Sequence, residues 1–136
     1  MRPEALNETI SRQRNLEEKC GGVIPIQQMD GFIVTEITTR ESGLPYPVYL
    51  ESLGRDTGMA PPQIRVCIDG YLIPVTISEN PEVIAGNIYE CRDDILLWVS
   101  KHFKVLEAHW NHQFDDPDVH EELKKENHNN TVVAVI

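Results

Sequence analysis

Two histidines near the end of a predicted long helix have the spacing of a metal site. His109 and His112 are three residues apart and would share a helix face, and Asp115 or Asp116 could supply a third ligand. Imidazole and carboxylate groups are common metal ligands, but no further distinctive motif surrounds this pair. The competing interpretation is that His109 packs at the core boundary while His102 and His112 face water.

Two other patterns suggest hydrolytic chemistry. Glu107 and His109 could act as a general acid–base pair in RNA cleavage, although nothing nearby supplies the cations that such an enzyme needs to bind phosphate. The Asp-Thr-Gly triplet at 56–58 is that of aspartic proteases, in which two copies of the chain would share a proton between their aspartates. A glycine and an arginine precede it where those enzymes have an apolar strand. We therefore also interpret it as a turn in which Asp56 hydrogen-bonds its own backbone.

The sequence suggests no bound cofactor. It contains no Gly-rich phosphate loop, no GxSxG motif and no Cys–His pairing pattern, so the predicted cofactor is none. The three cysteines, Cys20, Cys67 and Cys91, are odd in number and lack CxxC spacing, which indicates neither a disulfide framework nor a zinc knuckle. We expect a protein of the reducing cytoplasm.

Length and charge limit the function classes further. The 136 residues fit one domain that can bury a core without disulfides. With 12 Lys and Arg against 22 Asp and Glu, the formal net charge is −10. This balance argues against direct binding to the nucleic-acid backbone, which requires basic residues. No apolar run approaches the roughly 18 residues of a membrane span, so we expect no membrane segment and no signal peptide.

The clearest structural signal is the stretch 61–77, PPQIRVCIDGYLIPVTI. Its Asp-Gly pair at 69–70 stands between runs rich in Val and Ile and supplies the positive φ angles of a type I′ turn, which predicts a β-hairpin. In that register the core face carries Ile64, Val66, Ile68, Tyr71, Ile73 and Val75. We expect the opposite face to be solvated or only partly covered; it carries Gln63, Arg65, Cys67, Leu72, Pro74 and Thr76.

Pro74 gives the hairpin a predicted edge. The register directs its missing N–H away from the hairpin partner, so a further strand on that flank would lose a donor. We expect strand 71–77 to lie at a sheet edge or to carry a bulge, with neighbouring strands beside 63–69. Pro74 is therefore a candidate partner-binding position.

The remaining signals alternate between helix and strand. Helices are predicted over 3–19, 81–85, 92–112 and 116–125, and strands over 23–27, 31–38, 46–53 and 131–136, with a loop over 54–62. Together they predict an α+β fold, with an antiparallel sheet of four to five strands, the long helix across one face and an additional N-terminal helix. The chain divides into an N-terminal polar helix (1–22), an α+β core domain (23–112) and an acidic short helix with a C-terminal strand (113–136).

Both ends of the chain are candidates for partner binding. The apolar stripe of helix 3–19 is thin, so this helix either lies over the sheet or docks on another chain; its members are Leu6, Ile10 and Leu16. The final TVVAVI is strand-prone and nearly uncharged, and includes Val132, Val133 and Val135. An exposed strand of this kind invites aggregation, so we expect it to pair with a sheet edge in its own chain or in a partner's.

The segment 61–110 resembles a family of small bacterial proteins catalogued as domain-of-unknown-function family 4160. The matching residues are Pro61, Pro62, Ile64 and Val66, the stretch ISENPEVIAG at 77–86, and Leu106 and Trp110. The family's HxPPHxH histidines fall at Met59, Gln63 and Arg65 here, so the resemblance implies no metal or acid–base role for them. The family is often encoded beside small regulatory partners, and the resemblance therefore implies a partner-binding or toxin–antitoxin-like role.

Taken together, these signals favour a non-enzymatic, cytoplasmic protein that binds a protein partner or forms a homo-oligomer. The alternative is a small hydrolase, either metal-dependent and nuclease-like through His109 and His112, or dimeric and aspartic-protease-like through Asp56.

Overall fold

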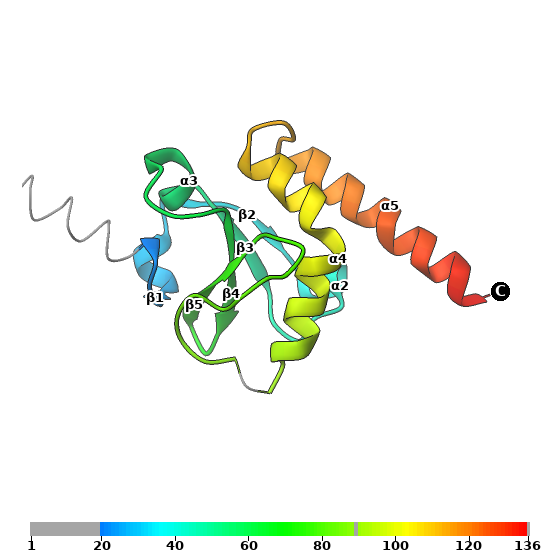
Figure 1. Ribbon diagram of the computed structural model, residues 1–136, viewed down its shortest axis with the longest axis horizontal. Helices are drawn as coiled ribbons and strands as arrows, with labels where there is room; N and C mark the ends of the chain where they lie inside the picture. Colours follow the sequence, from blue (N-terminus) through cyan, green and yellow to red (C-terminus); the bar gives the residue numbers. More distant parts are fainter. Residues whose placement is uncertain (1–19, 89, 136) are drawn as a thin grey trace, which may run out of the picture.

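The computed structural model describes residues 20–88 and 90–135, with the side chains of the last helix described as far as Glu126. Five strands form one antiparallel sheet in the order β1-β5-β4-β3-β2 (Figure 1). They are β1 (Ile24–Pro25), β2 (Ile33–Ile37), β3 (Val48–Glu51), β4 (Gln63–Ile68) and β5 (Tyr71–Thr76). The helical elements are η1 (Ile26–Met29), α2 (Thr39–Ser42), α3 (Leu53–Thr57), α4 (Arg92–Trp110) and α5 (Asp116–Val135).

This architecture confirms the predicted α+β class and the long helix packed across one face of the sheet. The main core lies between that face and the last two helices, because Ile95, Val99 and Leu106 of α4 and Val119 and Leu123 of α5 pack with the apolar side of the hairpin. The predicted helix 3–19, with Leu6, Ile10 and Leu16, lies outside the described residues.

The predicted hairpin is confirmed residue by residue. Ile64 faces Val75, Val66 faces Ile73 and Ile68 faces Tyr71 across β4 and β5. Asp69 and Gly70 have φ angles of 52° and 83°, as a type I′ turn requires. Tyr71 differs from the expectation of a core position, since it is 51% exposed beside the turn.

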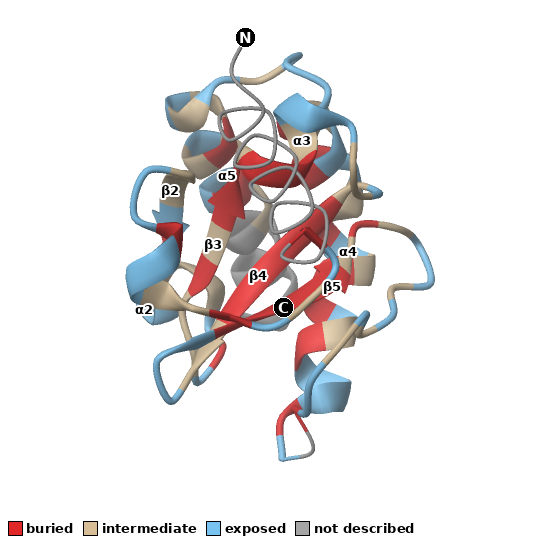
Figure 2. Ribbon diagram, turned by 90° about the vertical axis from the view of Figure 1, so that its left-hand side faces the viewer, coloured by how far each residue is buried: buried red, intermediate tan, exposed pale blue. Residues whose placement is uncertain are grey.

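The second face of the hairpin is buried, so the prediction of a solvated or partly covered face is wrong. Gln63, Arg65 and Leu72 are all within 1% of complete burial, and β4 is buried along most of its length in Figure 2. A smaller core covers this side, with Cys20, Ile24 and Met29 from the segment before β2 and Leu53 from α3. The polar residues on this face suggested solvent exposure, but they are buried because their hydrogen-bond partners come from distant parts of the chain.

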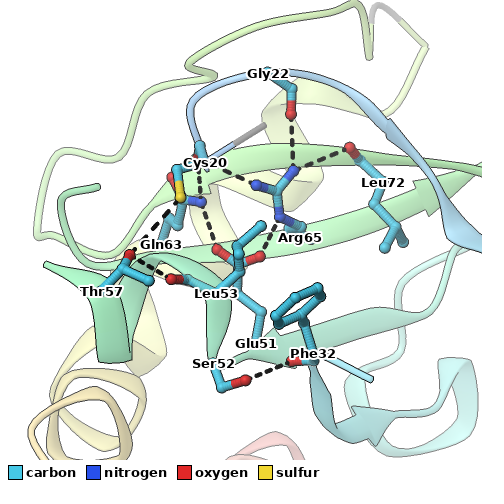
Figure 3. A network of polar contacts seen from close by, with 10 residues as sticks. All are labelled: Cys20, Gly22, Phe32, Glu51, Ser52, Leu53, Thr57, Gln63, Arg65 and Leu72. Atoms are coloured by element: carbon cyan, nitrogen blue, oxygen red, sulfur yellow. Dashed lines mark hydrogen bonds and ion pairs between the residues drawn. The ribbon is translucent and has the colours of Figure 1, made fainter. Parts of the chain in front are cut away.

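A buried polar cluster of Arg65, Glu51 and Gln63 lies on this second face (Figure 3). The Arg65 guanidinium pairs with the Glu51 carboxylate, and both side chains are fully buried. Gln63 Nε2 donates to Glu51 Oε1 at 2.6 Å and to the Cys20 carbonyl at 2.8 Å. Arg65 also donates to the carbonyls of Cys20 at 3.1 Å and Gly22 at 2.8 Å. The cluster therefore ties the incoming N-terminal segment to β4 and β3.

The outer flank of β5 is paired, so the predicted edge at Pro74 is wrong. β1 pairs with β5 only as far as Leu72, two residues before the proline. Beyond it the chain returns as an extended segment, in which Ile84 N donates to the Pro74 carbonyl at 3.0 Å and Thr76 N donates to the Glu82 carbonyl at 2.9 Å. This pairing uses the Pro74 carbonyl and does not need its missing N–H. Pro74 is buried and offers no open edge.

The prediction of a helical turn in this extended segment is also wrong. Residues 81–85 were expected to form a helical turn, but Val83 makes a β-bridge to Val75 instead. Glu82 N donates to Thr76 Oγ1 at 2.8 Å, which holds the segment extended against β5. The expected neighbour on the other side of the hairpin is confirmed, because β3 pairs with β4.

A short helix, α3, forms the first part of the loop predicted over 54–62, whereas residues 58–62 are irregular as predicted. It ends at Gly58, whose φ of 70° and N–H bond to the Gly54 carbonyl form a left-handed C-cap. Gly54 is required by packing, because a Cβ there would lie 2.7 Å from the Ala60 Cβ. Of the glycines that indicated a loop, Gly58 ends the helix, and Gly54 allows α3 to lie close to Ala60.

The C-terminal strand predicted over 131–136 is also wrong, because α5 continues as one helix from Asp116 to Val135. Once a helix is nucleated, each added residue brings one further hydrogen bond, so extension outweighs the local strand preference of valine. The last turns of α5 point away from the sheet, which leaves them no strand to pair with (Figure 1). Ile136 lies outside the described residues.

The cluster predicts a large stability effect for Arg65→Met. Removing the guanidinium leaves the Glu51 carboxylate buried without its cation, which should lower the free energy of unfolding by about 3–5 kcal/mol in urea titrations. The double variant Glu51→Leu/Arg65→Met should recover most of that loss, because no unpaired charge remains. Lys125→Met, which breaks an exposed pair with Glu122, is the control and should unfold like the parent. An Arg65→Met protein as stable as the parent would contradict this role of the ion pair.

Candidate functional site

Several of the residues singled out in the sequence meet at one corner of the molecule. A cavity of about 320 Å³ lies between β2, α3 and the turn that joins α4 to α5. It is lined by Val34, Arg55, His109, His112, Phe114, Asp115, Asp116 and Pro117. Asp56 is beside it, with its Oδ1 3.5 Å from His112 Nε2. Thus the candidates of the metal and aspartic interpretations are neighbours in space.

The surroundings of Asp56 favour its ionised form. Its Oδ1 accepts a hydrogen bond from Arg55 Nε at 2.9 Å, and that bond is the largest of the effects that lower the pKa of Asp56; the nearby His112 acts in the same direction. A proton-sharing pair of aspartates requires that one carboxyl keep its proton, which needs a raised pKa. The environment of Asp56 instead lowers its pKa.

His109 is buried and holds the connection between the two long helices. Its Nε2 lies 2.8 Å from Asp116 Oδ1, at the first residue of α5. This places His109 at the core boundary, as the competing interpretation expected. His112 is in the left-handed region at φ 59°, where the chain turns out of α4, and its side chain is 65% exposed.

Asp115 has a defined structural use at the start of α5. Its Oδ1 accepts from Asp118 N at 2.9 Å, while Asp118 Oδ2 accepts from Asp115 N at 3.1 Å. This reciprocal pair satisfies backbone donors at the helix N-terminus, as a capping box does. Within residues 20–88 and 90–135, no three His, Cys, Asp or Glu side chains are arranged to hold a metal ion.

Glu107 and His109 are not brought together as an acid–base pair. Positions two apart on a helix do not face each other. Glu107 is exposed on α4, whereas His109 is buried against the α4–α5 turn.

Two further histidines fasten α5 to the body of the protein. His102 of α4 is only 2% exposed and hydrogen-bonds the Glu126 carboxylate, so the expectation that it faces water is wrong. On the other side of α5, His120 Nδ1 lies 2.5 Å from Glu41 Oε2 and its Nε2 lies 2.8 Å from Thr35 Oγ1. The partners are 24 and 79 residues apart in the chain, so no local sequence pattern could have revealed them.

Glu41 is part of this fastening and of the cap of α2. Burial acts to raise the pKa of Glu41, but hydrogen bonds from the Thr38 backbone N–H and from His120 outweigh it and hold that pKa below its ordinary value. Thr38 and Glu41 also form a capping box at the start of α2. The ionised carboxylate therefore serves both the short helix and the docking of α5.

Two clefts flank this junction. One, of about 680 Å³, lies between α2 and α5 and is lined by Arg40, Glu41, His120, Glu121, Leu123 and Lys124. The other, of about 360 Å³, lies between α4 and the loop after α2 and is lined by residues 42–45 together with Asp94, Leu97, Trp98, Lys101 and His102. Leu97 is 69% exposed there, and the buried indole Nε1 of Trp98 has no hydrogen-bond partner.

Beyond Glu126, α5 leaves the body. Figure 1 shows α4 and α5 diverging from their connecting turn, so that the last turns of α5 extend past the rest of the fold. The stretch 127–135, NHNNTVVAV, contains no Asp, Glu, Lys or Arg. An uncharged helical segment thus projects from a protein of net charge −10.

The fold and this junction define a small α+β protein with a projecting C-terminal helix. No protein-family model, curated protein or solved structure matches the chain. The resemblance to domain-of-unknown-function family 4160 therefore stays a prediction from the residues of 61–110. In the described parts of the chain, none of the helices is both long enough and apolar enough to cross a membrane.

The lowered pKa of Glu41 predicts a specific pH dependence for Glu41→Gln, which keeps the cap geometry and removes the charge. Because the folded pKa lies below the unfolded one, the carboxylate stabilises the protein above pH 4.5, and this is lost as the pH falls through the folded pKa. The difference in free energy of unfolding between parent and variant should be about 0.5 kcal/mol near neutrality after solvent screening, and should decrease as the pH falls through the folded pKa of Glu41. A difference that stays constant across that range would contradict this role.

Proposed function

We propose that this protein is a non-enzymatic partner-binding or regulatory protein whose binding element is the distal half of α5, residues 127–135. The observation that carries the proposal is the projection of this uncharged helical segment beyond the fold (Figure 1). An amphipathic or apolar helix that leaves its own core commonly binds in a groove of another surface. The resemblance to a family encoded beside small regulatory partners supports a toxin–antitoxin-like arrangement.

The pairing of the histidines supports the same proposal. His102, His109 and His120 each contact a carboxylate of a neighbouring element, and each of these contacts holds α5 in place. Groups engaged in this way fix the direction in which α5 leaves the body. These three contacts thus serve the presentation of a binding element.

Deleting residues 131–136 should weaken association and leave the body folded. Among the α5 side chains that the structure describes, the buried ones, Val119 and Leu123, precede the deletion, so we expect an unchanged urea midpoint. Association should fall at least tenfold, because the deletion removes the apolar residues Val132, Val133 and Val135. The parent and the deletion variant would be compared for self-association by analytical ultracentrifugation and for co-purifying protein by quantitative mass spectrometry. An equal amount of associated protein in both would contradict the proposal.

The alternative is a small hydrolase at the corner cavity. Its supporting observation is that Asp56, His109 and His112 come from separate parts of the chain to one place, with Arg55 beside them. An arginine there would supply a cation for an anionic substrate. This alternative takes either the metal-dependent form through His109 and His112 or the aspartic form through Asp56.

The partner-binding proposal predicts no turnover at this cavity. The parent and Asp56→Asn/His112→Ala should give the same background rate on single-stranded RNA, DNA and unfolded peptide across pH 3–9, and metal analysis of the purified protein should find no stoichiometric metal. A rate that depends on Asp56 or His112, or one bound metal per chain, would favour the hydrolase instead.

A further inference from the structure

We propose that the partner of the distal half of α5 is a second copy of this chain, and that this segment covers the Leu97 face of the other copy. The Leu97 face consists of Leu97, Trp98 and Lys101 on α4 and the loop at 42–45. This inference rests on the proposed function, because it assigns a partner to the same binding element.

The Leu97 face combines an exposed apolar side chain with a buried hydrogen-bond donor that has no acceptor in the described chain. Leu97 is 69% exposed, the largest exposure among the large hydrophobic residues that the structure describes. Next to it, the indole of Trp98 is 93% buried and its N–H finds no acceptor in the described chain. A buried donor without an acceptor is costly. The cleft of about 360 Å³ at this place could admit a group that supplies one.

The projecting segment has the chemistry to complete this face. Residues 127–130 contain three asparagines, whose amide oxygens are acceptors for an indole N–H, and residues 132–135 are apolar and suited to Leu97. Its length of nine residues corresponds to a helix of about 13 Å, enough to cross one face of α4. The segment and the face thus complement each other within one sequence.

After Glu126, the ribbon of α5 is directed away from α4 of its own chain (Figure 1). His102 pairs with Glu126, the last described side chain of α5, and Leu97 on α4 is 69% exposed. If each copy places its segment on the Leu97 face of the other, both surfaces are covered by one two-fold operation. Such an isologous exchange closes as a dimer and leaves no free segment.

Charge favours this contact over others between two copies. Each chain carries a net charge of −10, so acidic surfaces repel when copies approach. The segment 127–135 carries no charged residue, and the face it would cover contains both Lys101 and Asp94. Contact through the segment therefore joins two copies without bringing like charges into apposition.

The test is the oligomeric state of the full chain by sedimentation equilibrium over a range of concentrations. The parent should form a dimer of twice the chain mass of 15.5 kDa. Leu97→Glu should raise the dimer dissociation constant by roughly tenfold or more, since it places a charge in the interface. Tyr71→Glu is the matched control, because Tyr71 is also an exposed large hydrophobic residue but lines neither cleft; it should dimerise like the parent.

A mixing experiment identifies the occupant of the face. A ¹⁵N-labelled chain shortened to residues 1–126 keeps its face and lacks the segment, whereas unlabelled Leu97→Glu keeps the segment and lacks the face. Each alone should be monomeric. On mixing, the indole N–H signal of Trp98 in the labelled chain should shift, while that of Trp110 should stay in place.

The possible results distinguish failure of the Leu97 interface from failure of the proposed partner-binding function. A dimer that Leu97→Glu leaves intact, or a Trp98 signal that does not move on mixing, overturns the Leu97 face as the interface. A monomeric parent that instead binds a different protein through residues 131–136 overturns the inference and leaves the proposed function standing. A monomeric parent whose associations are unaffected by that deletion removes both.

Discussion

The buried ion pair between Arg65 and Glu51 is the constraint on which the arrangement of the sheet depends. A fully buried charge is tolerated only when it is paired and its remaining donors are satisfied. Arg65 meets that requirement with the Glu51 carboxylate on β3 and with the carbonyls of Cys20 and Gly22 from the N-terminal side. The pair therefore fixes β4 against β3 and requires the segment at 20–22 to lie over the second face. Without that cover, β1 would not reach β5 and the smaller core would be open.

On the other face, the position of α5 depends on histidine–carboxylate contacts in addition to apolar packing. Val119 and Leu123 bury the first half of the helix, while His102 and His120 hold its two sides to α4 and α2. Glu126 is the last described side chain of α5, and the segment 127–135, which has no Asp, Glu, Lys or Arg, follows directly. One helix thus combines a fixed half with a projecting half. In the proposed function, the fixed half holds the projecting half as the binding element.

At the corner cavity, several candidate residues lie close together and also contact other residues of the fold. Asp56 and His112 come together there, but Arg55 already bonds Asp56, and His109 already contacts Asp116. Asp115 serves the cap of α5. Asp56, His109 and Asp115 thus each have a structural partner in the fold. The spacing in the sequence placed His109, His112 and Asp115 near one another, and they line one cavity, whereas the hydrogen-bond partner of Asp56 was not predicted.

Elements whose signals are local could be predicted from the sequence. The Asp-Gly turn and alternating apolar residues set the hairpin and its register, and helical periodicity set α4, because backbone dihedral preferences and period act within a few residues. Which surfaces are covered depends on contacts between distant parts of the chain, and these could not be predicted from local patterns. Arg65 pairs with Glu51 and Cys20, 14 and 45 residues away, and His120 contacts Glu41, 79 residues away. The polar character of these residues therefore resembled that of solvated positions until packing brought them together. Residues 131–135 have a local strand preference but are helical as the last residues of α5. Helix extension adds one hydrogen bond per residue, whereas a strand there would need a neighbouring strand for pairing.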